Sequence, residues 1–309
     1  MALEGQAAHM KYLVAGTLNY DITLFVSSIP KPGGETKVIR IKRALGGKGG
    51  NVATALARIA GGASFLGAVG NDEIARMHVE FFKGINVDTR FLKVIDGAES
   101  GTSYVVVDAR TGENVIMSYP GANSYLSANL VDEELKRELK EAKLVVAANC
   151  PPDLAEELFR SCSCLRIYIP ASHAPDACGR GADYIIVNES EGRMLRGCVR
   201  ESVVRTLGER GAELIGGGSS IRVQAVDLAK HGLRPASTAG AGDAFAGAFA
   251  AALALGYAEE DALKLANYAA ALKVTREDPR GSPSREELIK FLRAADPNFN
   301  LKGLSASLV

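Results

Sequence analysis

STAGAGDAF, at residues 237–245, is the stretch that decides the fold, and it runs without a break into an alanine-rich segment that ends at Leu255. The glycines indicate a tight turn and the alanines a helix, so the stretch predicts a helix that begins at the turn. The first N–H groups of a helix have no partner within the helix and lie at the positive end of its dipole. Backbone packed closely by Gly240 and Gly242 can therefore receive an anion such as a phosphate.

Asp243 stands inside this predicted anion site. A carboxylate beside a phosphate is electrostatically unfavourable unless it has a chemical task, and the obvious task is to remove a proton from an attacking hydroxyl group. Asp is also among the residues that most often cap helices. The short motif by itself favours capping, so the rest of the chain must decide between the two interpretations.

The chain has 309 residues, which is enough for one large α/β domain with an elaboration or for two domains. Lys and Arg together number 36, as do Asp and Glu, so the formal net charge is zero and no overall field attracts nucleic acid or an anionic membrane. The longest apolar run, residues 244–257, is mostly alanine and shorter than the ~20 strongly apolar residues of a membrane span. We therefore expect neither a nucleic-acid partner nor a membrane partner.

The five cysteines are an odd number spread over residues 150–198, and no charged-then-apolar secretory leader precedes them. This favours reduced thiols and a cytoplasmic location. The Cys-Ser-Cys run at 162–164 has no His or second Cys pair at zinc spacing, so we assign it to packing. Residues 1–9 are interpreted as an expression leader, because His9-Met10 is typical of a cloning junction, and residues 297–309 as a loose tail.

Short apolar runs alternate with helical patterns through most of the chain. This alternation predicts right-handed crossovers and a parallel sheet with helices on both faces. The runs read as buried parallel strands are 12–16, 65–69, 144–148, 167–169 and 184–187. A second set, 22–26, 36–41, 104–107 and 115–117, predicts strands that form a small β lid over the main sheet.

Polar side chains follow two of the buried strands. Asp21 comes soon after the strand at 12–16, and ligands of open parallel sheets bind beyond the carboxyl ends of strands, although a simple turn acid is as good an explanation. Asn188 and Glu191 follow the strand at 184–187 and could share a helix face and orient water around Mg²⁺. A capping box explains the same pair equally well.

A second glycine-rich stretch, GGKGGN at residues 46–51, precedes a helical pattern that we expect to begin at Val52. It is not a Walker A loop, because glycine follows Lys48 where Ser or Thr is required. It is also not a dinucleotide fingerprint, because it does not lie between a first strand and its helix. The lysine and Asn51 can instead hydrogen-bond polyol oxygens.

Together these motifs resemble the ribokinase-like (PfkB) carbohydrate kinase family, in the family's order and over nearly the whole span from Lys11 to Leu292. The motifs are Asn19-x-Asp21, Gly46-Gly47-Lys48-Gly49-Gly50-Asn51, Gly70-x-Asp72, Gly121-Ala122-Asn123, Asn188-x-x-Glu191, Thr206-x-Gly208-x-x-Gly211 and Gly240-Ala241-Gly242-Asp243.

The resemblance implies an α/β fold, a ribokinase-like three-layer α/β/α sandwich with a mostly parallel central sheet and a small β-sheet lid. The main domain would comprise residues 10–16, 46–97 and 122–296, and the lid residues 17–45 and 98–121.

The resemblance also implies a role for each motif residue. Asp243 would be the catalytic base, and the amides of Gly240, Ala241 and Gly242 would form the anion hole. The sugar would be held by Asn19, Asp21, Gly47, Lys48, Asn51 and Asn149. The nucleotide would be bound by Asn188, Thr206, Gly208, Gly211 and Asn267, with Glu191 holding Mg²⁺ through water.

The implied activity is Mg-ATP-dependent phosphoryl transfer to a hydroxymethyl group, with ADP left open as the donor. Ser237 stands where the family usually has Asp in a monovalent-cation loop, and this departure weakens the case for potassium activation. Ribokinases tend to carry a glutamate that contacts the sugar near the end of the strand at 144–148, where this chain has Asn149-Cys150-Pro151-Pro152. In addition, Arg40, Lys42 and Arg43 lie in the lid. A sugar phosphate such as fructose 6-phosphate or a ribose phosphate therefore stands beside ribose as the acceptor.

Three other functions are alternatives to the sugar kinase. The alternative of the same fold is a nucleoside kinase, for which Phe25, Tyr104, Tyr119 and Tyr125 could contact a base. A non-catalytic sensor would not need a base at Asp243. A dehydrogenase is disfavoured because neither glycine-rich stretch of this chain has the spacing of a dinucleotide-binding loop. An exposed apolar lid face also suggests a homodimer formed through the lid.

Overall fold

A ten-stranded sheet organises the chain, which the computed structural model describes over residues 10–305. The strand order is β14-β13-β12-β11-β10-β9-β1-β4-β5, with β6 also paired to β4. The pairs from β12 to β5 are parallel, whereas β13 and β14 extend the sheet antiparallel. The bounds are β1 Tyr12–Gly16, β4 Ala63–Gly70, β5 Val87–Asp88, β6 Leu92–Ile95, β9 Leu144–Ala148, β10 Leu165–Ile169, β11 Tyr184–Asn188, β12 Ser202–Thr206, β13 Ala212–Gly216 and β14 Ser219–Val223.

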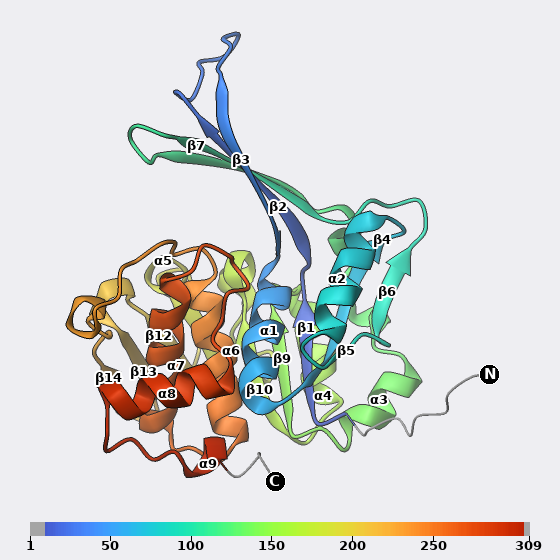
Figure 1. The fold of residues 1–309 in the computed structure, drawn as a ribbon. Helices are drawn as coiled ribbons and strands as arrows, with labels where there is room; N and C mark the ends of the chain where they lie inside the picture. Colours follow the sequence, from blue (N-terminus) through green and yellow to red (C-terminus); the bar gives the residue numbers. More distant parts are fainter. Residues whose placement is uncertain (1–9, 306–309) are drawn as a thin grey trace.

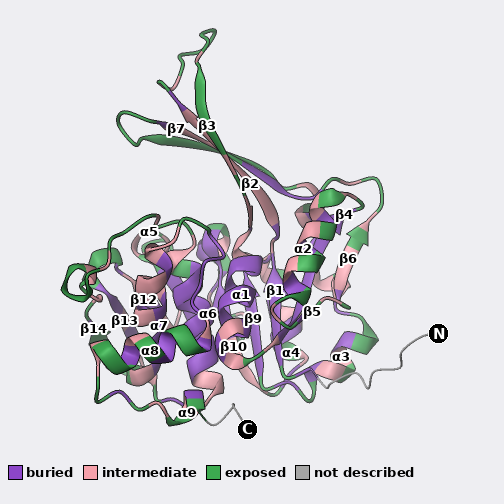
Figure 2. Cartoon of the chain, viewed as in Figure 1, coloured by how far each residue is buried: buried purple, intermediate pink, exposed green. Residues whose placement is uncertain are grey.

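The central strands are buried along their whole length, which agrees with their continuous apolar sequences. Every residue of β1, β4 and β9 is buried (Figure 2). Side chains of a strand alternate between the two faces of a sheet. Tyr12 and Val14 accordingly join one apolar cluster, and Leu13 and Ala15 join another. Both faces of the sheet are therefore covered, as in other parallel sheets.

Helices form the two outer layers (Figure 1). The first cluster includes side chains of α1 (Lys48–Ala60), α2 (Glu73–Lys83), α6 (Ala241–Ala254), α7 (Glu259–Val274) and α8 (Arg285–Ala295). The second includes side chains of α3 (Glu133–Leu139) and α4 (Pro152–Arg160). Two short helices, α5 (Glu189–Gly192) and α9 (Lys302–Ser305), complete the set in residues 10–305. The predicted three-layer α/β/α arrangement is confirmed.

The helices α1 and α6 pack closely because a glycine lies between them. A Cβ atom at Gly247 would lie 2.5 Å from the Val52 carbonyl oxygen and 2.6 Å from the Ala55 Cβ. Real Cβ atoms do not approach that closely, so a side chain here would push the helices apart. The small residues of α6 thus bring the N-termini of both helices together.

The lid is a separate four-stranded sheet of order β3-β2-β7-β8 that projects from the body (Figure 1). Its strands are β2 Asn19–Val26, β3 Val38–Gly46, β7 Thr102–Asp108 and β8 Asn114–Tyr119. The prediction of these strands is confirmed, but β3 continues beyond the expected end at residue 41. Because α1 begins at Lys48, two residues after β3 ends, the lid leads directly into the GGKGGN stretch.

The expectations for the cysteines and for the C-terminal segment are wrong. Cys178 and Cys198 are joined by a disulfide, so the cysteines are not all reduced. The segment after residue 297 is not a loose tail over its described part, because Phe299 and Leu304 are buried and the Leu304 N–H donates to the Tyr257 hydroxyl. Apolar side chains at these positions were the missed signal. None of the helices in residues 10–305 combines the length and the apolar character needed to cross a membrane.

Candidate functional site

The N-terminus of α6 is shaped by Gly240, which precedes it in the left-handed conformation with φ of 77°. A Cβ atom there would lie 2.3 Å from the Pro279 carbonyl oxygen. The positive φ and this close contact each require glycine at the position. Nothing lies within 4 Å of a Cβ built on Gly242, so the space beside the first turn of α6 is open at this residue. The Ala241 N–H donates to the Thr238 carbonyl. Of the three predicted anion-hole amides, Ala241 is therefore already paired.

Asp243 lies inside the first turn of α6 and is 6% exposed. Its Oδ2 accepts a hydrogen bond of 2.8 Å from Asn51 Nδ2, and its Oδ1 lies 3.5 Å from Lys48 Nζ. The N-cap of α6 is Gly240, without a side-chain cap. Asp243 is therefore not the cap, and the chain holds its carboxylate by contacts from another helix.

Lys48 and Asn51 both belong to the first turn of α1, which begins at Lys48 and not at Val52 as the sequence predicted. Gly47, with φ of 86°, makes the turn into the helix. The nearby Asp243 carboxylate raises the pKa of Lys48. Asn51 Oδ1 is buried with no hydrogen-bond partner in the described chain. Both side chains, expected to hold sugar hydroxyls, thus first contact the predicted base.

Asp21 on β2 lies against the same loop, since a Cβ atom at Gly46 would be 2.0 Å from Asp21 Oδ2. Burial raises the pKa of Asp21 to about 6; the Arg280 guanidinium lowers it and the nearby Asp243 raises it further. Asp21 of the lid and Asp243 of the body therefore lie close enough for their charges to interact.

Asn19 and Asn149 lie at strand ends near this space. Asn19 Oδ1 accepts a 3.0 Å hydrogen bond from Asn123 Nδ2, and Asn123 also bonds both backbone groups of Leu18. Asn149 has φ of 53°, and its side chain lies within hydrogen-bond distance of Thr17 and Ser172. Asn123 thus positions Asn19, a role that the sequence motif did not reveal.

Arg280 is a residue that sequence reasoning missed. It is 1% exposed, and its Nη2 donates to the Gly46 carbonyl at 3.0 Å and lies 2.9 Å from His78 Nδ1. Burial and the guanidinium hold the pKa of His78 well below its ordinary value. An arginine in a polar loop is usually exposed, so no local pattern could have indicated this contact beneath the GGKGGN turn.

Asn188 and Glu191 form a capping box at the start of α5, which is the structural one of the two roles considered for this pair. The Glu191 N–H donates to Asn188 Oδ1 at 2.8 Å, and the Asn188 N–H donates to Glu191 Oε2 at 3.0 Å. The charge of Glu191 nevertheless contributes to the raised pKa of Lys48, so Glu191 is close enough to Lys48 for the two charges to interact. In residues 10–305 no group of three or more His, Cys, Asp or Glu could hold a metal ion by itself.

The remaining predicted nucleotide residues gather at the far end of the sheet. The Gly211 backbone, with φ of 88°, packs against Val223, where a Cβ atom would lie 2.1 Å from the carbonyl oxygen. Asn267 on α7 donates to the Gln224 carbonyl at 3.1 Å and borders a cavity of about 430 Å³. Thr206 ends β12 and Gly208 follows it with φ of 59°. Thr206, Gly208 and Gly211 therefore lie near the strand ends from which the cavity beside Asn267 opens.

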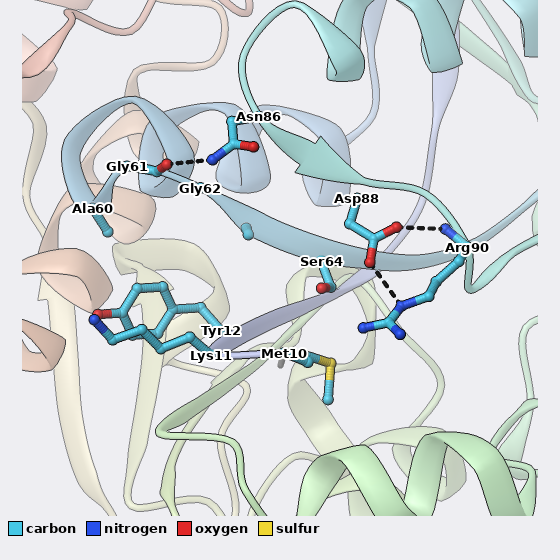
Figure 3. A pocket seen from close by; sticks show the side chains of 11 residues that line it. Met10, Lys11, Tyr12, Ala60, Gly61, Gly62, Ser64, Asn86, Asp88 and Arg90 are labelled. Atoms are coloured by element: carbon cyan, nitrogen blue, oxygen red, sulfur yellow. Dashed lines mark hydrogen bonds and ion pairs between the residues drawn. The ribbon is translucent and has the colours of Figure 1, made fainter. Parts of the chain in front are cut away.

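A cavity of about 620 Å³ lies elsewhere, where β1 and β4 begin (Figure 3). It is lined by Tyr12, Ser64 and Arg90 among others, and Arg90 is paired with Asp88 at 2.7 Å. None of the predicted site residues lines it. Ligands of parallel sheets bind at the carboxyl ends of strands, so this cavity is not the candidate site.

Comparisons with known proteins agree with this geometry. The model of the pfkB family carbohydrate kinases matches residues 10–285. The chain is 28% identical to a ribokinase of Haemophilus influenzae, over 91% of this chain and 98% of that protein. It is 27% identical to an ATP-dependent ribose-1-phosphate kinase of Halopiger xanaduensis, over 92% and 98%.

A solved ribokinase of Thermotoga maritima superposes with a TM-score of 0.79 at 27% identity, over 92% of this chain and 99% of that one. The match covers both the body and the lid, and the ribokinase-like fold expected from the motifs is confirmed. The chain therefore belongs to the pfkB family of carbohydrate kinases and is a phosphotransferase with an alcohol group as acceptor.

Proposed function

We propose that this chain transfers the γ-phosphoryl group of ATP to a hydroxymethyl group of a pentose or a sugar phosphate, with Asp243 as the general base. The observation that carries the proposal is the buried Asp243 carboxylate, held by Asn51 and Lys48 beside the open N-terminus of α6. A base must reach the hydroxyl proton while an anion site receives the transferred group. The start of α6 offers both within one helical turn.

In the proposed step the Asp243 carboxylate takes the proton of the acceptor hydroxyl as that oxygen bonds to the γ-phosphorus. The bond between this phosphorus and the bridging oxygen of ATP breaks, and ADP leaves. The Lys48 ammonium lies 3.5 Å from Asp243 Oδ1 and forms an ion pair with the proposed base. Gly242 is exposed, and the Ala241 N–H is already bonded to the Thr238 carbonyl, so we propose the Gly242 N–H as the amide that receives the transferred group.

Glu191 is proposed to hold Mg²⁺ through water. Only Oε2 of this carboxylate takes part in the capping box, which leaves Oε1 for a water ligand of the ion. When bound, Mg²⁺ would neutralise charge on the phosphates. Asn188, Thr206, Gly208, Gly211 and Asn267 are proposed to contact the nucleotide, because they lie along the same sheet edge.

The acceptor is proposed to sit between Asp21 and Asp243, with Asn19, Gly47, Lys48, Asn51 and Asn149 around it. The unpartnered Asn51 Oδ1 supports this placement, because a buried polar atom without a partner is rare unless a ligand completes it. The lid cations that could bind a phosphate on the acceptor are Arg40, Lys42 and Arg43. Lys42 donates to the Glu277 carbonyl at 2.6 Å, and Arg40 lies 3.9 Å from the Phe25 ring centroid, so two of the three lid cations are engaged within the chain.

The strand register of the lid bears on two of the four aromatic residues that could contact a nucleoside base, Tyr104 and Tyr119. Tyr104 is paired with Ile22, and Thr102, the partner of Tyr119, is paired with Tyr20. Ile22 and Tyr20 are the neighbours of Asp21 in β2, and alternate residues of a strand point to opposite faces. Tyr104 and Tyr119 therefore lie on the lid face away from Asp21, where they could not stack on a base bound beside it.

An acceptor panel tests the proposal. Purified protein is incubated with Mg-ATP, or with Mg-ADP, and ribose, ribose 1-phosphate, ribose 5-phosphate, fructose 6-phosphate or nucleosides, and products are identified by mass spectrometry. We expect phosphorylation of a sugar or sugar phosphate with ATP. Phosphorylation of nucleosides alone would replace this proposal with the nucleoside kinase.

We also propose a homodimer formed through the lid. Ile39, Ile116 and Met117 are 60%, 61% and 52% exposed there, and exposed apolar side chains gathered on one small sheet favour a covering partner. Light scattering should give twice the chain mass, and the Ile116→Glu variant should give the monomer mass. A wild-type monomer at micromolar concentration would contradict the proposal.

The proposed location is the cytoplasm, where the proposed donor ATP is found. The Cys178–Cys198 disulfide is the observation against it, since disulfides are rare in the cytosol outside hyperthermophiles. Fractionation of source cells, with thiols alkylated before lysis, tests the location and the bond together.

A further inference from the structure

Lys273, near the end of α7, is completely buried although lysine is among the residues least often buried. Its Nζ donates to the Arg276 carbonyl at 3.0 Å and to the Ser237 carbonyl at 3.3 Å. Both hydrogen-bond partners are backbone oxygens and not carboxylates. A cation held in this way has a coordination chemistry like that of a bound metal ion, in which carbonyl dipoles replace water.

The two carbonyls belong to the segments that shape the start of α6. Ser237 opens the stretch that ends at Gly240, and its N–H is bonded to the Val274 carbonyl beside Lys273. Arg276 opens the loop that contains Pro279, whose carbonyl lies against Gly240. Through these two hydrogen bonds Lys273 links the segment that leads into α6 to the loop whose Pro279 carbonyl lies against Gly240.

This arrangement does not fit a free monovalent cation at the same carbonyls. The family resemblance implied such a cation near residue 237, where Ser237 stands in place of the usual Asp. The Lys273 ammonium already takes the Ser237 carbonyl, and a second cation beside it would be repelled. The serine also supplies no negative charge to attract one.

We propose that the Lys273 ammonium is a built-in cation that positions the 237–242 turn for phosphoryl transfer, so that this chain needs no potassium ion. The inference rests on the proposed function for its kinetic consequence, but the positioning itself is a property of the fold. Lys273 touches neither substrate and is a positioning residue. Burial, followed by the charge of Lys42, lowers its pKa to about 8; Asp278 and Asp243 oppose this, and Arg276 adds to it.

The first experiment uses the wild-type protein. Turnover of the best acceptor is measured in 0.1 M potassium chloride and in 0.1 M tetramethylammonium chloride, at equal ionic strength. We expect rates within twofold of one another, because the cation is part of the chain. A stimulation by potassium of tenfold or more would overturn the proposal, and this arm does not depend on any variant folding.

The second experiment uses Lys273→Met, which keeps the length of the side chain and removes its charge. We expect kcat to fall at least tenfold with KM for the acceptor changed less than threefold, and potassium or ammonium chloride to restore part of the loss while tetramethylammonium does not. Lys290→Met, at an exposed position of α8, is the control and should behave as wild type. Wild-type kcat in Lys273→Met would overturn the proposal.

Thermal unfolding separates this inference from the proposed function. The midpoint of Lys273→Met should rise by several degrees in potassium chloride relative to tetramethylammonium chloride, and that of the wild-type protein should not. This readout remains informative if no acceptor on the panel is phosphorylated. A wild-type midpoint that rises specifically with potassium would show that the free ion binds after all, and would contradict the inference.

Discussion

Replacing Asp243 with Asn tests the proposed base with little change in shape. The carboxylate makes a 2.8 Å hydrogen bond with Asn51 and lies 3.5 Å from Lys48. The Asn side chain can still accept the hydrogen bond from Asn51 through its amide oxygen. The Lys48 side chain is 40% exposed, so water can replace its lost partner. We therefore expect the free energy of unfolding to change by no more than about 1 kcal/mol, the usual size of one neutral hydrogen bond.

The effect on turnover should be far larger. General-base catalysis contributes roughly 10²–10⁴ in rate, which corresponds to about 3–5 kcal/mol in the activation free energy at 1.36 kcal/mol per tenfold. The assay measures kcat and the acceptor KM for the wild-type and Asp243→Asn proteins, with urea unfolding of both. We expect kcat to fall by at least about 10² while KM stays within a few-fold.

The matched control is Asn51→Leu, which removes the hydrogen bond but keeps the carboxylate. It should lose less turnover than Asp243→Asn, because the base remains. Turnover of Asp243→Asn within tenfold of wild type, in a folded protein, would refute the assignment of Asp243 as the base. Because Asn51 is also proposed to contact the acceptor, kcat is compared at saturating acceptor, and a larger loss of kcat in Asn51→Leu than in Asp243→Asn would contradict the assignment.

Three further predictions concern stability. Burial raises the pKa of Asp21 from its ordinary value of 3.8 to about 6. Between these two pH values the native state keeps a proton that the unfolded chain has lost. The free energy of unfolding therefore falls as pH rises through this window, by up to roughly 3 kcal/mol. Urea unfolding of wild type and Asp21→Asn at pH 4 and pH 7 should show the variant gaining on wild type at pH 7, and a pH-independent difference would count against the shift. Cys178→Ser removes a bond that closes a sequence separation of 20 residues, so its free energy of unfolding should fall by about 3 kcal/mol and become insensitive to dithiothreitol; full reductant sensitivity of the variant would contradict this. Gly247→Ala should cost about 1–3 kcal/mol in urea unfolding, because its Cβ would meet the Val52 carbonyl at 2.5 Å, and a stabilised variant would show that α1 and α6 can separate freely.

The order of strands and helices could be predicted from the sequence because each depends on local patterns. Continuous apolar runs such as 144–148 are typical of buried parallel strands, and the structure contains that strand with the same bounds. The glycines before α6 also act locally, since Gly240 must adopt a positive φ. The end of β3 was missed, because its last residues, up to Gly46, form a strand by pairing with β2.

Side-chain contacts between distant segments could not be predicted in the same way. Asn51 and Asp243 are separated by 192 residues in sequence, and only the close packing of α1 against α6 brings the amide to the carboxylate. The disulfide between Cys178 and Cys198 depends on how the chain returns after α5. An odd number of cysteines carried no signal for this pairing.

By itself, the sequence determined the family, the three-layer architecture and the position of the candidate base, because these follow from periodicity and from glycine-rich motifs along the chain. Only the tertiary structure decided what surrounds that base: Lys48 and Asn51 contact it directly, Arg280 lies beneath the turn before α1, and Lys273 binds the Ser237 carbonyl below the start of α6. The physical reason is that a charged side chain has no preferred partner until packing removes water from it. The partner is then set by which backbone carbonyls and carboxylates the fold has brought within about 3 Å.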